Sequence, residues 1–265
     1  MGTALLAASL TGLATGLGAI PFLFVSALPR RAYDGILGLG AGLMLAAATL
    51  GLLGEALSHL HTPEGIELGR LVLIIFGFVA GVGVAATMDR FIPHRHAGGH
   101  HQHLGHEPGH DHHDPQHEVR RGYAVVGALS LHRVPEGLAI GAGFALDGGT
   151  HLGWLLAIAV GIQNACEGVV MAAPLRQGGL SPGRALLTVT LTGLAIPLGA
   201  LAGQLLASAA TLAMPFVLAL AAGTLIFITS NEIIPESHSH GHEGTASSGV
   251  ALGFLLTMLL QALLH

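Results

Sequence analysis

The stretch ALLTVTLTGLAIPLGALAGQLLASAATLAMPFVLALAAGTLIFITSN, residues 185–231, runs for 47 positions without a single Asp, Glu, Lys or Arg. A transmembrane helix needs about 20 apolar residues, so this stretch is too long for one crossing. We expect a break at residues 207–215, which divides it into two spans. Charged residues make up only 9% of the whole chain, against roughly 25% in an average soluble domain. The sequence therefore predicts an integral membrane protein.

Six further apolar stretches predict the remaining spans of an all-α, polytopic membrane protein with eight transmembrane helices. They lie at residues 2–29, 36–58, 67–89, 122–146, 152–173 and 246–264. Threading the chain through a bilayer gathers most arginines on one side, namely Arg30, Arg31, Arg90, Arg95, Arg120, Arg121, Arg176 and Arg184. The positive-inside rule assigns that side to the cytoplasm, which leaves both termini outside a cell (inner) membrane. We expect residues 1–265 to form a single transmembrane domain.

One long polar loop, residues 92–120, interrupts the apolar pattern and carries ten of the 18 histidines. Gly, Pro and Asp separate these histidines and disfavour helix or strand, so we expect a flexible cytoplasmic loop. Imidazole is a common zinc ligand, and the irregular spacing is unlike that of an affinity tag. We predict labile metal binding, as a buffer or sensor, by His94, His96, His100, His101, His103, His106, His110, His112, His113 and His117.

Ionisable side chains inside two consecutive spans form a matched pattern. The fourth span reads SLHRVPEGLAIG (residues 130–141) and the fifth reads IQNACEGVVMAAP (residues 162–174). Each charge at mid-bilayer costs about 2.5–3.5 kcal/mol on insertion scales, so such groups need a reason. Positions i and i+4 share one helix face. His132 therefore projects with Glu136, and Gln163 projects with Glu167.

The short connection between these spans makes them antiparallel neighbours. We therefore expect one imidazole, one amide oxygen and two carboxylates to converge at a similar depth. This donor set suits Zn²⁺ or a similar divalent transition metal. A structural hydrogen bond is the ordinary explanation for one isolated His or Glu, but two matched pairs on adjacent helices favour a metal site.

The paired motifs and the preceding His-rich loop together resemble the ZIP (Zrt/Irt-like) family of metal transporters, bacterial type. The segments GLGAGLMLAA at 38–47, GLAIPLGA at 193–200 and ITSNEIIPESHSHG at 228–241 are similar to the family's second, sixth and seventh spans. The resemblance covers essentially the whole chain. It implies a 3+2+3 arrangement of helices with inverted pseudo-symmetry, and transport of divalent metal, Zn²⁺ first, toward the cytoplasm.

The resemblance also implies roles for particular residues. The family's primary metal site falls on His132, Glu136, Gln163 and Glu167. Met44 of the second span is either a soft neighbour of that site or a packing methionine. The cytoplasmic end of the seventh span resembles an exit relay made of Glu232, Glu236 and His238.

The chain departs from the family pattern at a second, adjoining metal site that many bacterial members build. The positions of that site here are Arg133, Asn164 and Ile196. Arginine offers only donors and isoleucine has no ligand atom. We therefore predict a single-metal site in which the Arg133 guanidinium stands where the second cation would sit and pairs with Glu136 or Glu167. The alternative is an Arg133 side chain that points away from the site.

Two other functions stay open from the residues alone. A proton-driven metal exporter usually has six spans and a folded cytoplasmic domain, and an intramembrane metallohydrolase would use its bound ion to activate water. The sequence does not show the exporter's features, and none of the expected membrane spans contains an HExxH motif, so we expect a transporter and no enzyme. It has no basic patch for nucleic acid. It does not rank Zn²⁺ above Cd²⁺, Fe²⁺ or Mn²⁺, nor decide between a monomer and a homodimer.

Overall fold

Helices dominate the computed structural model, which describes residues 2–62, 65–91, 115–145, 150–209 and 214–264. The first part of the chain forms α1 Gly2–Ala19, η1 Ile20–Leu23, α2 Arg30–Ala46, η2 Ala47–Leu53, α3 Gly54–Ser58 and α4 Leu68–Phe91. The second part forms α5 Pro115–Ala145, α6 Thr150–Gln177, α7 Pro182–Thr192, α8 Ala195–Ala209, α9 Met214–Ile228, η4 Thr229–Ile233, α10 Ile234–Ser237 and α11 Glu243–Leu264. Strands β1 His61–Thr62 and β2 Gly65–Ile66 pair as a short antiparallel hairpin.

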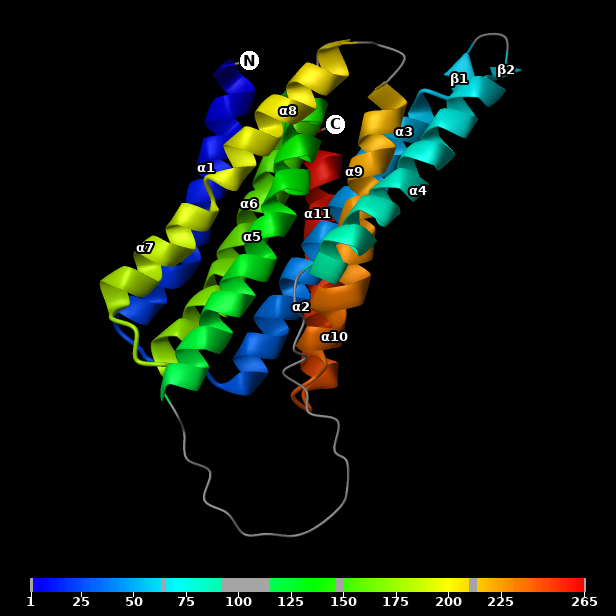
Figure 1. Ribbon diagram of the computed structural model, residues 1–265. Coiled ribbons are helices and arrows are strands. Elements are labelled where there is room, and N and C mark those ends of the chain that lie inside the picture. Colours follow the sequence, from blue (N-terminus) through cyan, green and yellow to red (C-terminus); the bar gives the residue numbers. More distant parts are fainter. Residues whose placement is uncertain (1, 63–64, 92–114, 146–149, 210–213, 265) are drawn as a thin grey trace.

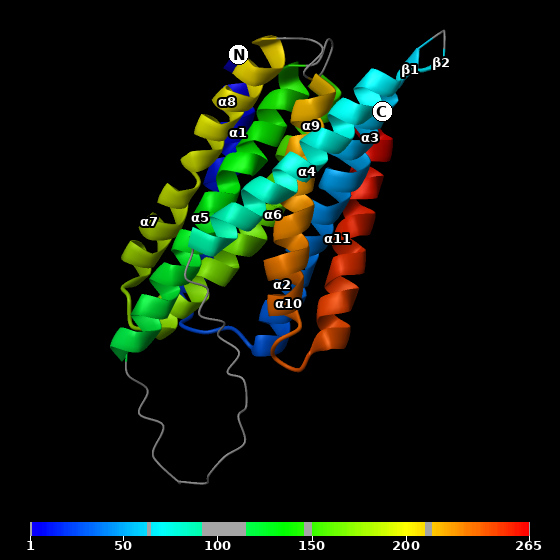
Figure 2. The same ribbon diagram turned by 45° about the vertical axis from the view of Figure 1, so that its right-hand side comes forward.

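Consecutive helices join into long units that match the expected spans. Within the described residues, seven units are long and apolar enough to cross a membrane: α1–η1, α2–η2–α3, α4, α6, α7–α8, α9–η4–α10 and α11. The remaining long helix, α5, carries His132 and Glu136 and packs lengthwise against α6 and α8. The two ends of the chain lie at the same end of the bundle (Figures 1 and 2), as an even number of crossings requires. The predicted polytopic all-α fold is confirmed.

The boundaries of the polar loop differ from the prediction. Helix α5 begins at Pro115, so the expectation of a flexible loop is wrong for residues 115–120. Proline suits the first turn of a helix because its missing N–H needs no partner there. His117 therefore belongs to α5, whereas residues 92–114, with the other histidines of the predicted metal-binding loop, lie outside the described residues.

The packing of the helices has an internal two-fold pattern. The principal contacts pair α1 with α6, α8 with α5, α2 with α11, and α9 with α4. Numbered by span, α1–α6 is the pair 1–5, α8–α5 is 6–4, α2–α11 is 2–8, and α9–α4 is 7–3. Exchange span 1 with 6, 2 with 7, 3 with 8 and 4 with 5. The pair 1–5 then becomes 6–4, and the pair 2–8 becomes 7–3. Spans one and six cross in opposite directions, so this is the 3+2+3 arrangement with inverted pseudo-symmetry.

The same relation places a π-helical segment in both the second and the seventh span. Segment η2 follows α2, and segment η4 follows α9. A π-helix adds a residue to the turn and shifts the faces of the helix that follows, and such segments often lie at functional sites. In the seventh span, η4 carries Glu232 of the predicted exit relay.

Close helix contacts explain much of the glycine content. A Cβ atom on Gly137 of α5 would lie 2.1 Å from the carbonyl oxygen of Ile196, and one on Gly199 of α8 would lie 2.3 Å from that of Val134. These distances are too short for any side chain, so the two backbones touch only because both positions are glycine. Small residues at such contacts are typical of membrane helix interfaces, where hydrophobicity does not drive association.

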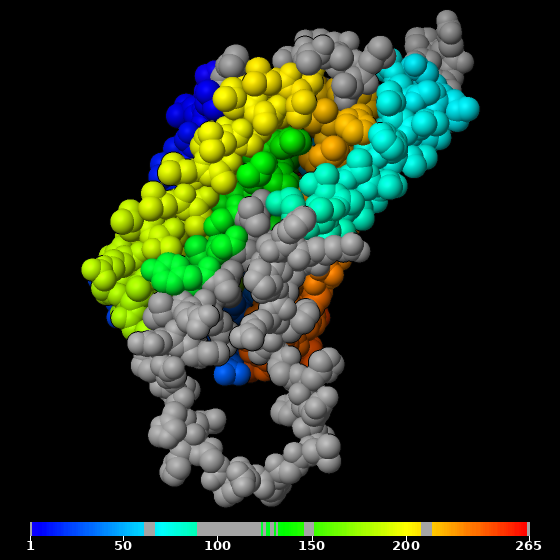
Figure 3. Space-filling model, viewed as in Figure 1, coloured from blue at the N-terminus to red at the C-terminus, as the bar shows by residue number. Residues whose placement is uncertain are grey.

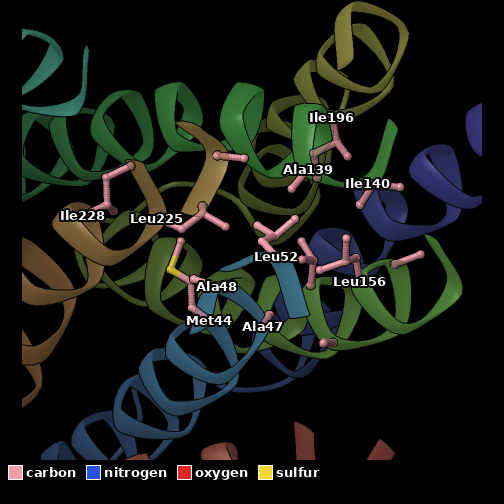
Figure 4. Packing of buried hydrophobic residues seen from close by; sticks show 14 of the residues in the cluster. Met44, Ala47, Ala48, Leu52, Ala139, Ile140, Leu156, Ile196, Leu225 and Ile228 are labelled. Atoms are coloured by element: carbon pink, nitrogen blue, oxygen red, sulfur yellow. The ribbon is translucent and has the colours of Figure 1, made fainter. Parts of the chain in front are cut away.

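An apolar core fills the bundle between the second, fourth, fifth and seventh spans. Figure 4 shows Leu52 of η2 beside Leu156 of α6, and Met44 of α2 beside Leu225 of α9. All four side chains are almost completely buried. The exposed large apolar side chains lie on the outer surface, including much of α4 and of α7–α8, which form two sides of the face in Figure 3. Such a surface suits lipid rather than water.

Candidate metal site

Six polar side chains are buried at the contact between α5 and α6. None exposes more than 2% of its surface: they are His132, Arg133, Glu136, Gln163, Asn164 and Glu167. The i, i+4 spacing places the Glu of each helix one turn from its His or Gln partner. Buried ionisable groups in a membrane helix usually pair with one another and mark a functional pathway.

The Gln163 amide joins the two carboxylates through its nitrogen, whereas the sequence pattern predicts that its oxygen faces the site. Its Nε2 donates to Oε1 of Glu136 at 3.0 Å and to Oε1 of Glu167 at 2.8 Å. The second oxygen of Glu136 and the amide oxygen of Gln163 are both buried, and neither has a hydrogen-bond partner in the described structure. Two unpartnered oxygen acceptors from one carboxylate and one amide are ligand atoms suited to a divalent cation.

Arg133 points into the cluster, and its guanidinium contacts Glu167 rather than Glu136. Its NH2 donates to Oε2 of Glu167 at 3.2 Å, and its NH1 donates to Oδ1 of Asn164 at 2.8 Å. A fully buried guanidinium is tolerated only when paired, because desolvating an isolated charge is very costly. Two of the three positions expected to replace a second metal site therefore bind each other, while the third, Ile196, is a buried apolar side chain.

His132 differs from the other three residues of the predicted primary site. Its Nε2 lies 3.3 Å from Oε1 of Glu232, on η4 of the seventh span, and its buried Nδ1 has no hydrogen-bond partner in the described structure. Among the described residues, no three His, Cys, Asp or Glu side chains lie close enough together to hold a metal ion. In this conformation the imidazole thus connects the site to the seventh span.

The other predicted residues lie in two places. Met44 is buried in the apolar core, together with Leu225. Glu236 and His238 follow Glu232 at the end of the seventh span, where Nε2 of His238 contacts the Ser247 hydroxyl at 3.0 Å.

The structure adds residues that the sequence reading did not single out. Thr15 of α1 is fully buried, and its hydroxyl accepts from Arg133 NH1 at 2.9 Å. One turn earlier, the carbonyl of Thr11 accepts from Nδ2 of Asn164 at 3.3 Å. The Thr-x-x-x-Thr spacing in the first span was the available signal, although threonine pairs are too common in membrane helices to predict a role.

A second polar cluster lies at the end of the bundle opposite the termini. The carboxylate of Asp34, at the start of α2, is fully buried. Its two oxygens contact Nδ1 of His240 at 2.8 Å and Nδ1 of His242 at 3.1 Å. This cluster ties the connection between α10 and α11 to α2, and sequence reasoning missed it because Asp34 is about 200 residues away from its partners.

A bundle of apolar helices around a buried cluster of carboxylates, amides and a guanidinium defines a polytopic membrane protein with an intramembrane polar site. The chain matches the family described as ZIP Zinc transporter over residues 93–261. It is 39% identical to the Zinc transporter ZIPB of Bordetella bronchiseptica, over 95% of this chain and 78% of that protein. It is 35% identical to the Zinc transporter GufA of Myxococcus xanthus, over 98% of each chain. The chain therefore belongs to the ZIP zinc transporter family.

Proposed function

We propose that the protein carries divalent transition-metal ions across the membrane toward the cytoplasm, with Zn²⁺ as its main cargo. The observation that carries this proposal is the buried bridge of Gln163 between Glu136 and Glu167, because the one charge of Arg133 balances only one of these two carboxylates. Relatives named as zinc transporters over nearly the whole chain support the choice of cargo. Zinc, cadmium, iron and manganese ions share this set of N and O ligands.

The cargo ion would bind between α5 and α6. Three acceptors there have no partner in the described part of the chain, and they belong to three of the four residues of the proposed site: Glu136 Oε2, Gln163 Oε1 and His132 Nδ1. Binding the ion through Glu167 as well requires that the Gln163 amide release Oε1 of Glu167, because Oε2 accepts from Arg133. The ion would then replace an amide hydrogen as the positive partner of that oxygen.

A single ion per chain follows from Arg133. Its guanidinium brings a permanent positive charge beside Glu167, and like charges repel in a medium of low dielectric. The acceptors that would hold a second cation are occupied, since Asn164 Oδ1 and Glu167 Oε2 both accept from Arg133. We therefore propose that the guanidinium serves as a built-in second cation.

Glu232 offers the cargo a route out of the site. Its contact with His132 joins the site to the seventh span, and its side chain is 18% exposed while that of His132 is only 2% exposed. Glu236 and His238 continue along the same end of the bundle. By the positive-inside rule, the arginine distribution favours a cytoplasmic location for this end of the bundle and an outside location for the termini. The histidines of residues 94–117 would then buffer ions released at the cytoplasmic side.

Uptake into proteoliposomes with an enclosed zinc indicator tests the function. The wild-type protein should load the vesicles with Zn²⁺, and Glu136→Ala should abolish loading. Glu67→Gln is the matched control, because Glu67 is a partly exposed carboxylate paired with Arg70 far from the site. No loading above that of empty vesicles would refute the proposal.

The direction and the stoichiometry need separate measurements. In intact cells, expression should raise cytoplasmic zinc; a fall would indicate an exporter instead. Equilibrium dialysis with Zn²⁺ should show that Glu136→Ala removes one bound ion per chain from the wild-type total. Loss of two ions would contradict the single site. Release of products from peptide or lipid would indicate a metallohydrolase.

A further inference from the structure

We propose that Thr15 of α1 is a positioning residue for the metal site: its hydroxyl holds the Arg133 guanidinium on Glu167 and so leaves Glu136 available to the cargo. This inference rests on the proposed function of the site. It brings the first span, which supplies no proposed ligand, into the control of metal binding.

The packing of α1 against α6 places Thr15 within reach. A Cβ atom on Gly168 would lie 2.0 Å from the carbonyl oxygen of Thr15, and one on Gly18 would lie 1.9 Å from that of Ala165. These two glycines let the backbones touch one turn from the site. The hydroxyl of a short side chain such as Thr15 can therefore reach a guanidinium that extends from α5 across α6.

Four acceptors fix the orientation of the guanidinium. NH1 donates to Oγ1 of Thr15 at 2.9 Å and to Oδ1 of Asn164 at 2.8 Å, while NH2 donates to Oε2 of Glu167 at 3.2 Å and to Sδ of Met171 at 3.9 Å. A guanidinium is planar and its donors form a rigid fork, so acceptors on two of its nitrogens determine where the charge points.

Asn164 does not hold this geometry alone. Its own amide is oriented by α1, because Nδ2 donates to the carbonyl oxygen of Thr11 at 3.3 Å. Thr11 and Thr15 thus act from one face of α1 on the two ends of the Asn164–Arg133 contact. Because the amide is already committed, removal of the Thr15 hydroxyl leaves an N–H of NH1 buried without an acceptor, which drives the guanidinium to seek another.

Without the Thr15 hydroxyl, the Arg133 guanidinium would compete with the cargo ion for Glu136. The two carboxylates are bridged by Gln163, and Oε2 of Glu136 has no partner among the residues that the structure describes. A guanidinium released from Thr15 can turn toward that oxygen and occupy an acceptor that the cargo needs. Thr15 therefore keeps the two carboxylates unequal, with one neutralised by arginine and the other open.

Zinc affinity of the full-length protein in detergent, measured by competition with a zinc indicator, tests this role. We expect Thr15→Val to weaken binding at the site about tenfold, the equivalent of about 1.4 kcal/mol. Thr15→Ser, which keeps the hydroxyl, should bind within about twofold of wild type. Thr224→Val is the matched control, since that buried hydroxyl donates to the Gly81 carbonyl, away from Arg133.

An Arg133→Met background separates positioning from general damage. Without the guanidinium, Thr15→Val should have no further effect on affinity. An equal loss in both backgrounds, or equal affinities of Thr15→Val and wild type, would overturn the inference. If Thr15→Val does not fold, Thr15→Ala replaces it in the same cycle. Wild-type protein that binds no zinc at the Glu136 site would instead refute the proposed function.

Discussion

Replacing Glu167 with glutamine should destabilise the protein far more than the same change at Glu136. Glu167 uses both oxygens, one accepting from Gln163 at 2.8 Å and the other from Arg133 at 3.2 Å. A glutamine has only one acceptor oxygen, so its NH2 group must face one of two donors. The Arg133 charge is then left buried without a counter-ion.

The magnitudes follow from these partners. Removing one member of a buried ion pair costs about 3–5 kcal/mol, because the other charge remains uncompensated. Among the described residues, Glu136 accepts only from Gln163 and its second oxygen has no partner, so a glutamine there can keep the existing hydrogen bond. We expect Glu136→Gln to cost no more than a typical net hydrogen bond, about 1 kcal/mol. Both variants should still lose zinc uptake, because each removes a proposed ligand charge.

Thermal unfolding in detergent, followed by circular dichroism, compares the two variants under identical conditions. The double variant Glu167→Gln with Arg133→Met removes both charges and should recover most of the stability lost in Glu167→Gln. Equal unfolding temperatures for the two single variants would refute the assignment of the arginine charge to Glu167. So would a double variant that is no more stable than Glu167→Gln.

Three further predictions follow from other contacts. Gly137→Ala should destabilise the fold by about 1–3 kcal/mol through overpacking against α8, whereas Gly183→Ala, with no atom within 4 Å of the new Cβ, should not lower the unfolding temperature. Arg133→Asn should raise the zinc stoichiometry of the site, measured by equilibrium dialysis, because it removes the built-in cation; an unchanged stoichiometry and affinity would contradict that role. Glu232→Gln should slow zinc uptake while leaving equilibrium zinc affinity nearly unchanged, and an equal loss of both would argue against an exit role.

The fold and the pairing of the central helices could be predicted because they depend on local and periodic features. Long apolar stretches determine the spans, and the i, i+4 spacing places Glu136 and Glu167 on faces that meet in the structure. Helix α5 begins at Pro115, earlier than predicted. This boundary was not predicted because Gly- and Pro-rich sequence with many histidines gives no clear helix boundary. The proline that signals it, Pro115, is also typical of loops.

A polytopic helical membrane protein with paired polar motifs in its fourth and fifth spans could be predicted from the residues alone, because hydropathy and helical periodicity are properties of neighbouring residues. The partners of those motifs became visible only in the packed helices. The residues alone allow Arg133 to pair with Glu136 or Glu167; in the structure it pairs with Glu167, and Thr15 of α1 and Asn164 of α6 accept from the same guanidinium. His132 contacts Glu232 from the seventh span, 100 residues further along the chain. Contacts between distant spans depend on how the backbones pack, and spacing within one helix does not encode them.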